Sequence, residues 1–127
     1  MPCFRLRLVL AATLAGVPLS VPVRAADADA GAAVFRAQCK VCHSVERGGE
    51  ALAGPSLFGV VGRHASAVPD FRYSPANRRA DLTFDAPTLD RYITNPQAMI
   101  PGTVMAYPGL KDPTRRSDLI AFLATQK

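Results

Sequence analysis

A cluster of two cysteines and one histidine constrains this chain more than any other feature of its sequence. Cys39, Cys42 and His43 lie within five residues, whereas the chain of 127 residues has one further cysteine, Cys3. Such a cluster can hold a metal ion, exchange electrons as a dithiol, or bond covalently to a cofactor. Each of these functions requires a different surrounding fold, so the rest of the chain has to decide between them.

The first 25 residues predict an export signal that is cleaved from the folded protein. Arg5 and Arg7 precede a long apolar run, and Val23 and Ala25 occupy the two positions that a signal peptidase reads. An uncleaved anchor is an alternative, although proline interrupts the run and it is shorter than the roughly 20 residues that span a membrane. A mitochondrial transit peptide fits poorly, because the segment lacks amphipathic spacing. Residues 26–127 then form one small domain.

Removal of the signal would lower the net charge of the chain and leave it with two cysteines. All 10 acidic residues lie beyond Ala25, so the loss of three signal arginines reduces the net charge from +5 to +2. A weakly basic chain without a stripe of Lys and Arg is a poor candidate for nucleic-acid binding. Cys3 leaves with the signal, and Cys39 and Cys42 are then the only cysteines in an oxidising compartment, where free thiols do not persist.

The chain beyond Ala25 predicts an all-α domain of short helices separated by long loops. Four segments carry a cap residue followed by apolar positions at helical spacing. They are residues 29–42 with Asp27 or Asp29 as the cap, 74–79 with Ser74, 85–95 with Asp85, and 112–127 with Asp112. Residues 47–71 and 95–110 predict loops, and loops of this length usually wrap a ligand or carry function. With eight prolines and no Trp, the domain has little apolar volume of its own.

The lack of a second ligand pair argues against a zinc site, and the lack of predicted strands argues against a redox dithiol. A closed zinc site needs a fourth ligand beside Cys39, Cys42 and His43, and the chain contains no second spaced pair. A thioredoxin-like pair should follow a β-strand, whereas this one ends a predicted helix. The remaining function is haem c attachment, in which two thiols three residues apart meet the vinyl groups of one porphyrin edge and the histidine binds the iron. Cys-X-X-Cys-His is a specific signal for it.

A haem iron bound by His43 has one further axial position, for which the chain offers two methionines. Met99 and Met105 flank the segment Ile-Pro-Gly-Thr-Val, and for either residue the alternative is to fill the core. Met105 is favoured because the Pro-Gly turn before it can present it from the side opposite His43. A lone His64 in a loop is more typical of a solvated or hydrogen-bonded residue. His/Met ligation closes the iron and suits one-electron transfer.

From Gly31 to Leu123 the chain resembles the class I cytochromes c, and more closely their mitochondrial-like and bacterial c2-type branch. The resemblance is carried, in the family's order, by CKVCH, GPSLFGVVGR, FRYSPAN, LDRYITNP, IPGTVMAYPGL and RRSDLIAFL. It implies an all-α class I cytochrome c fold, in which helices and long loops wrap around one covalently bound haem. It also implies that the first and last helices cross, so that Gly31 and Phe35 meet Phe122.

The resemblance implies a role for each residue that matches the family's motifs. Cys39 and Cys42 would form the thioethers to the haem, and His43 and Met105 would be the axial ligands of the iron. The carbonyl of Pro55 would accept a hydrogen bond from the ring of His43. Tyr92 and Thr103 would line the pocket on the Met105 side. The inner propionate and an ordered water would be held by Arg63, Tyr73, Ser74 and Asn77.

The chain departs from the family at three points. Phe84 stands where the family typically has a Trp that donates to the buried propionate, so we expect Arg63 to carry more of that interaction. Val104, Gln97 and Ala98 stand where mitochondrial relatives have lysines. We therefore expect a partner interface that is more apolar and less steered by charge. The 95–104 loop also has no lysine that could replace the Met ligand at alkaline pH.

These features predict a soluble one-electron carrier of the bacterial periplasm rather than an enzyme. It would shuttle electrons between respiratory or photosynthetic complexes, or between dehydrogenases and oxidases, and dock on these redox proteins at an exposed haem edge. Neither nucleic-acid binding nor stable membrane insertion after cleavage is expected. The alternative is an electron-relay subunit bound permanently to a periplasmic dehydrogenase, which the small number of lysines would fit. A sensor or peroxidase would need an open distal site.

Overall fold

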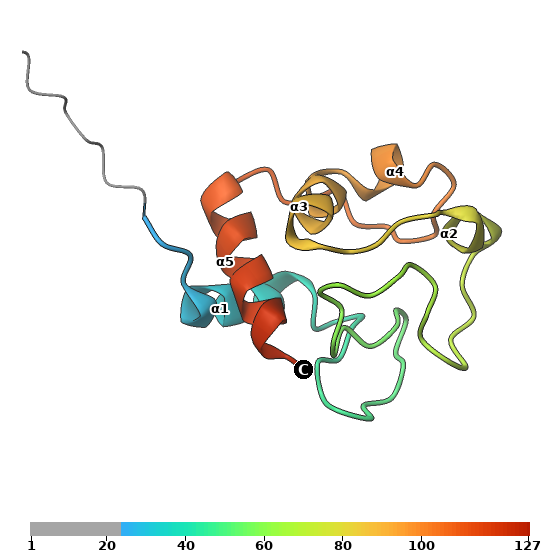
Figure 1. Ribbon diagram of the computed structural model, residues 1–127, viewed down its shortest axis with the longest axis horizontal. Helices are drawn as coiled ribbons and strands as arrows, with labels where there is room; N and C mark the ends of the chain where they lie inside the picture. Colours follow the sequence, from blue (N-terminus) through green and yellow to red (C-terminus); the bar gives the residue numbers. More distant parts are fainter. Residues whose placement is uncertain (1–23) are drawn as a thin grey trace, which may run out of the picture.

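The described part of the chain, residues 24–127 of the computed structural model, consists of helices joined by long loops (Figure 1). Its helices are α1 (Ala28–Gln38), α2 (Pro75–Arg79), α3 (Ala86–Thr94), α4 (Pro96–Met99) and α5 (Pro113–Thr125). Within residues 24–127 the β pairing is limited to an isolated antiparallel bridge between His64 and Thr83. The predicted all-α class is thereby confirmed. The predicted export signal lies outside the described residues, except for its last two positions.

Local capping chemistry explains where the helices begin. Asp27 caps α1, because its carboxylate accepts hydrogen bonds from the backbone N–H groups two and three residues further on. Asp112 caps α5 in the same way, and Ser74 and Asp85 cap α2 and α3 by accepting from the N–H three residues further on. Each of these three helices also has a proline in its first two positions. These four predicted helix starts are confirmed, with Asp27 rather than Asp29 as the cap of the first.

Two segments differ from the prediction. The first helix ends at Gln38 rather than at Cys42, because the N–H groups of the next two residues both bond to the carbonyl of Phe35 and close the helix. The segment predicted as a loop from residue 95 contains the short helix α4, which Asn95 caps by accepting a 3.2 Å hydrogen bond from the N–H of Ala98. A helix of four residues is too short to show a helical pattern of apolar positions.

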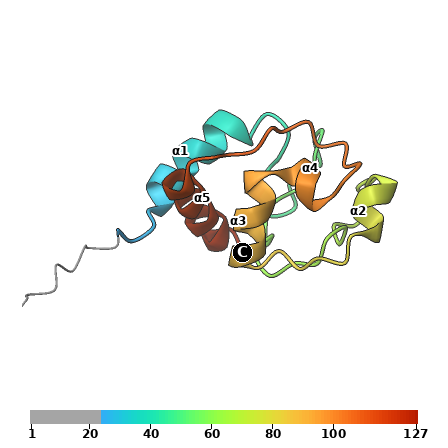
Figure 2. The same ribbon diagram turned by 90° about the horizontal axis from the view of Figure 1, so that it is seen from above.

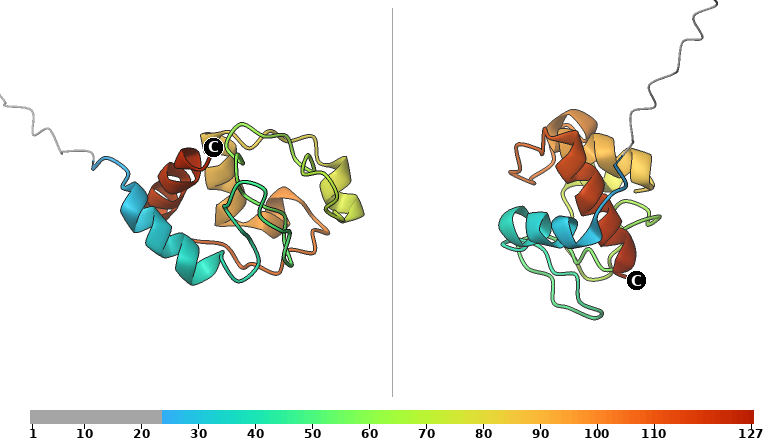
Figure 3. Two further views of the ribbon diagram at one scale, coloured as in Figure 1. Left: turned by 90° about the horizontal axis from the view of Figure 1, so that it is seen from below. Right: turned by 90° about the vertical axis from the view of Figure 1, so that its left-hand side faces the viewer.

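The two terminal helices cross in close contact, as Figure 3 shows from two sides. A Cβ atom on Gly31 would lie 1.9 Å from the carbonyl oxygen of Asp118 and 2.8 Å from the Cβ of Phe122, so a larger residue would force α1 away from α5. The rings of Phe35 and Phe122 pack with their centroids 5.5 Å apart. The helix crossing and the contacts of Gly31 and Phe35 with Phe122 are therefore confirmed.

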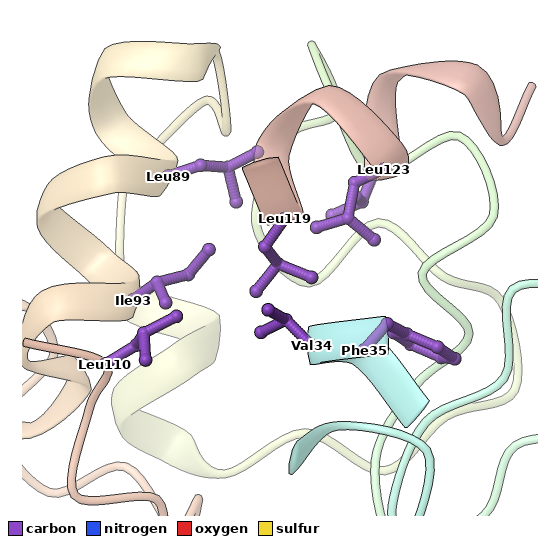
Figure 4. Close-up of a cluster of buried hydrophobic side chains, with 8 residues drawn as sticks. Val34, Phe35, Leu89, Ile93, Leu110, Leu119 and Leu123 are labelled. Carbon is purple, nitrogen blue, oxygen red and sulfur yellow. The ribbon is translucent and has the colours of Figure 1, made fainter. Parts of the chain in front are cut away.

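A cluster of buried apolar side chains joins α1, α3 and α5 (Figure 4). The cluster consists of Val34, Phe35, Val60, Leu89, Ile93, Leu110, Leu119 and Leu123. Leu89 and Ile93 of α3 and Leu119 and Leu123 of α5, which the sequence places at apolar helical positions, belong to this cluster. Cys39 and Phe84 are partly buried and pack against it, so the core reaches the cysteine cluster.

Two charged residues of α5 are buried, and each is paired with a distant segment. The Nε of Arg116 donates to Oδ1 of Asp90 in α3 at 2.7 Å. Asp118 accepts hydrogen bonds from the guanidinium of Arg24 at 2.9 Å and from the backbone N–H of Asp27 at 2.8 Å. Since a buried charge is tolerated when it is paired and hydrogen-bonded, these contacts fix α5 against α3 and the start of α1.

Two helices lie at one end of the molecule and one at the other, with α3 and α4 between them and long loops joining them (Figure 2). In Figure 2, α1 and α5 lie at one end and α2 at the other. Residues 39–74 lead from α1 to α2, and residues 100–112 lead from α4 back to α5. Among residues 24–127, no helix combines the length and the apolar character needed to cross a membrane. Most of the predicted site residues lie on these long connections.

Candidate haem site

The cysteine cluster forms one helical turn directly after α1. The backbone N–H groups of Cys42 and His43 bond to the carbonyl of Cys39 at 3.0 and 2.9 Å. Both cysteines are free thiols and partly buried, as is His43. The residues between the cysteines are exposed, and 82% of the Val41 surface is accessible. The turn therefore directs the three chemically active side chains inward.

The thiol of Cys39 is held in its neutral form. Burial, with a smaller contribution from Cys42, raises the pKa of Cys39 to about 11. Cysteines that bind metals or exchange disulfides act as thiolates, and their pKa is typically lowered instead. Moreover, the described residues contain no group of three or more His, Cys, Asp and Glu side chains placed to hold a metal ion. A neutral, partly buried thiol is compatible with covalent attachment through sulfur.

His43 is oriented by the segment that follows the cluster. Its Nδ1 lies 2.7 Å from the carbonyl oxygen of Pro55, which can only accept a hydrogen bond, so Nδ1 carries the proton and Nε2 keeps its lone pair. Burial lowers the pKa of His43, and the bond to Pro55 partly opposes this. The ring is therefore neutral at neutral pH, which is the form that binds iron.

Gly54 forms the wall behind the His43 ring, a role that was not predicted. A Cβ atom on Gly54 would lie 2.3 Å from Cε1 and 2.8 Å from Nε2 of that ring. The N–H of Gly54 bonds to the carbonyl of Cys42 at 2.8 Å, which holds the wall in place. The motif GPSLFGVVGR contains this glycine, but nothing in the motif shows which side chain packs against it. The cradle fits an imidazole whose free nitrogen binds an iron.

The sulfur of Met105 lies at the end of a chain of hydrogen bonds. Tyr92 of α3 donates its hydroxyl hydrogen to the Sδ of Met105 at 3.4 Å. The N–H of Met105 donates to Oγ1 of Thr103 at 3.3 Å, and the hydroxyl of Thr103 donates to Oδ1 of Asn77 at 3.0 Å. Burial raises the pKa of Tyr92, so its hydroxyl stays protonated and able to donate. The structure thus brings together four predicted site residues from α2, α3 and the loop after α4.

Ser74 extends this network to a fifth predicted residue. Its hydroxyl donates to Oδ1 of Asn77 at 2.7 Å and also accepts the N–H of Asn77, which caps α2. The Oδ1 of Asn77 therefore accepts bonds from both Ser74 and Thr103. Phe84, the residue in place of Trp, packs its ring against that of Tyr92 with centroids 5.2 Å apart, and its side chain has no hydrogen to donate.

Arg63 and Tyr73, also predicted to hold the propionate, make their hydrogen bonds elsewhere. The guanidinium of Arg63 donates to the carbonyl oxygens of Phe58 and Ser56, both at 2.8 Å. The hydroxyl of Tyr73 accepts the N–H of Val68 at 3.3 Å. Burial lowers the pKa of Arg63, although a guanidinium remains charged at any physiological pH. In this structure the two residues therefore hold the loop before α2.

His64 is a surface residue. Its Nε2 lies 3.1 Å from Oδ1 of Asp81, and its side chain is more than half exposed. The carboxylate of Asp81 raises the pKa of His64. The prediction that His64 is hydrogen-bonded at the surface is confirmed.

Comparison with known proteins identifies the family. The family model for cytochrome c matches residues 28–127. The chain belongs to the cytochrome c family. Cytochrome c2 of Rhodomicrobium vannielii is 48% identical over 102 residues, which cover 80% of this chain and 81% of that protein. Cytochrome c2 of Blastochloris viridis is 43% identical over 115 residues, covering 91% and 85%. Cytochrome c of the plant Guizotia abyssinica is 41% identical over 99 residues, covering 78% and 89%.

Membership of the cytochrome c family confirms the resemblance to class I, c2-type cytochromes and the expected all-α fold. The cofactor of this family is one covalent haem c, and Cys39 and Cys42 fit its attachment motif with the histidine that follows. Members of the cytochrome c family are electron carriers, so the chain is a haem protein of electron transport.

Proposed function

We propose that this chain is an exported, soluble one-electron carrier whose haem iron is bound by His43 and Met105. The proposal depends above all on the contact between Tyr92 and Met105. In this contact the hydroxyl of Tyr92 holds the thioether sulfur of Met105. The imidazole of His43, on another segment, is oriented by the carbonyl of Pro55. Residues 1–25 would be removed during export to the bacterial periplasm. The bacterial cytochromes c2 among the relatives support this compartment.

The cysteines would bind the porphyrin, whereas His43 and Met105 would bind the iron. Cys39 and Cys42 would form the thioethers, and the Pro55 carbonyl would keep the Nε2 of His43 directed at the iron. When bound, the haem supplies the redox chemistry, because its iron takes up and releases one electron. The imidazole of His43 and the soft sulfur of Met105 would hold the iron, and this pair of ligands would favour the reduced state relative to harder ligands.

The propionate would be held by the network around Asn77. Since Oδ1 of Asn77 accepts from Ser74 and Thr103, its Nδ2 group is the end that can donate to a carboxylate. Phe84 cannot make the donation that a Trp would make. Arg63 uses two of its five N–H donors on loop carbonyls and would stabilise the propionate through its charge and its remaining donors.

The exposed residues next to the proposed haem edge are mostly uncharged, with Lys40 beside Val41 as an exception. Val41 lies between the two cysteines and is 82% exposed, and Val104 directly precedes Met105 and is 79% exposed. Gln97 and Ala98 are also exposed and are uncharged. We infer that partner redox proteins dock on this surface through apolar contact, with little electrostatic steering of the encounter.

A visible spectrum with pyridine haemochrome analysis, combined with an intact mass, tests the proposal. Protein made together with the haem-attachment machinery should carry one covalent haem and lack residues 1–25. The oxidised form should show the red absorption of a sulfur-to-iron bond. A colourless product, or binding of carbon monoxide by the reduced protein without displacement of a ligand, would contradict it. Stable co-purification with a dehydrogenase at high salt would instead support a fixed relay subunit.

A further inference from the structure

The side chain of Gln97 crosses from α4 to the loop that carries Met105. Its Nε2 donates to the carbonyl oxygen of Met105 at 2.9 Å and to that of Thr103 at 3.3 Å. Gln97 is exposed, and its contribution to the docking surface proposed above rests on its lack of charge and not on these two bonds. An exposed glutamine usually has several accessible conformations, so two bonds to neighbouring carbonyls on one segment are informative.

With this contact, each polar atom of Met105 has a partner on a different part of the chain. The N–H donates to Thr103, the sulfur accepts from Tyr92 of α3, and the carbonyl accepts from Gln97 of α4. The loop itself turns sharply, because the N–H of Thr103 bonds to the carbonyl of Ile100 at 3.0 Å. The bond from Gln97 bridges this turn on its solvent side, so it must break if residues 103–105 are to swing outward.

We propose that Gln97 is a positioning residue that limits the departure of the Met105 sulfur from the iron. The inference depends on the proposed His43/Met105 ligation. A glutamine suits this task, because its amide donates hydrogen bonds and is neither charged nor basic enough to replace the sulfur as a ligand. The contact therefore strengthens the Met105 ligand without offering a competitor for the iron.

The test is displacement of the sulfur by imidazole in the oxidised haem-loaded protein. Imidazole can bind only when Met105 leaves, so its apparent affinity reports how readily the loop opens. Gln97→Ala should raise this affinity roughly 2- to 12-fold, which is the factor expected for the loss of one net hydrogen bond. The red sulfur-to-iron absorption should disappear at correspondingly lower imidazole concentration. Gln97→Arg should restore the wild-type affinity, since a guanidinium can donate to both carbonyls and stays protonated.

Gln126→Ala is the matched control. The Nε2 of Gln126 also donates to a backbone carbonyl, that of Phe122 at 3.5 Å, but at the end of α5. Its removal should leave the imidazole affinity unchanged. An unchanged affinity in Gln97→Ala, an equal rise in both alanine variants, or a failure of Gln97→Arg to restore the affinity would each overturn the role of Gln97. A wild-type protein without the red absorption would instead show that Met105 is not the ligand, and the inference would fall with the proposed ligation.

Discussion

Replacing Gly54 by alanine would place a methyl group where the ring of His43 now lies. The added Cβ would be 2.3 Å from Cε1, 2.6 Å from Nδ1 and 2.8 Å from Nε2 of the ring. Atoms in unstrained contact prefer about 3.5 to 4.0 Å, so the ring would have to move by roughly 1 Å. The backbone of Gly54 cannot retreat instead without breaking its N–H bond to the carbonyl of Cys42.

The free-energy change has two parts. Overpacking of a filled site typically lowers the free energy of unfolding by about 1 to 3 kcal/mol. Displacing the ring also breaks the 2.7 Å bond between His43 and Pro55, and an unpaired buried donor adds about 1 to 3 kcal/mol. The expected loss of about 2 to 6 kcal/mol is a large part of the 5 to 15 kcal/mol that stabilises a typical domain. Because a displaced ring also presents Nε2 differently, the reduction potential should change as well.

Denaturant unfolding and potentiometric titration of the haem-loaded protein measure these two effects. Gly48→Ala is the control, because its φ of +69° strains any other residue while its added Cβ would have nothing within 4 Å. It should lose about 1 kcal/mol of stability and keep the wild-type potential. If Gly54→Ala showed the wild-type unfolding midpoint and potential, the assignment of Gly54 as the wall behind His43 would be refuted.

Four further predictions concern charges around the site. Arg63→Ala should lower the free energy of unfolding by roughly 2 to 3 kcal/mol, because two charged hydrogen bonds are lost, and it should also lower the reduction potential. Arg63→Lys should keep most of the reduction potential. An unchanged stability and potential in Arg63→Ala would contradict the role of Arg63. The red sulfur-to-iron absorption should persist to a higher pH than in a Val104→Lys variant, which adds an amine beside Met105; equal midpoints on alkaline titration would count against this. Electron-transfer rates with partner proteins should fall only weakly as ionic strength rises, and a steep fall would show a charged docking face. In the chain that retains Arg24, the hydrogen bonds from Arg24 and then from the Asp27 N–H hold the pKa of Asp118 below its usual range, so their stabilisation is present above the unfolded-state pKa of about 3.9 and is lost as the pH falls through the lower folded-state value. Cleavage after Ala25 would remove Arg24 and leave the bond from the Asp27 N–H, so this test uses a chain that keeps residue 24. Asp118→Asn should therefore flatten the loss of stability on acidification, as followed by unfolding between neutral pH and pH 2.

Most of the fold could be predicted from local chemistry in the sequence. A cap residue followed by proline marks the start of a helix through contacts within four residues, so Ser74, Asp85 and Asp112 could be recognised without any tertiary information. The end of the first helix could not, because its closing bonds depend on the backbone path after Gln38 rather than on a glycine or proline signal. The helix α4 is likewise too short for its sequence pattern to predict it.

The buried charges of α5 could not be predicted from the sequence either. A sequence pattern places Arg116 and Asp118 on the polar side of an amphipathic helix, and charged residues are seldom buried unless they are paired. Their partners are Asp90, 26 residues away, and Arg24, 94 residues away. Such pairs lower the cost of burial only after the helices have met, so nothing local in the sequence indicates them.

In the site, the candidate residues and the bond between His43 and the Pro55 carbonyl could be predicted from the sequence and its resemblance to the family, whereas the positioning contacts of Gly54 and Gln97 could not. A thiol, an imidazole and a thioether are specific to Cys, His and Met, so their spacing carries information. The groups that orient them are largely backbone atoms: the carbonyl of Pro55 holds His43, and the carbonyl of Met105 receives Gln97. Every residue type offers a carbonyl, and Gly54 acts only through the side chain that it lacks. The strength of the two proposed bonds to the iron would therefore depend on atoms that leave no signature in the sequence, and it is at Gly54 and Gln97 that substitutions should alter the iron site without replacing a proposed ligand.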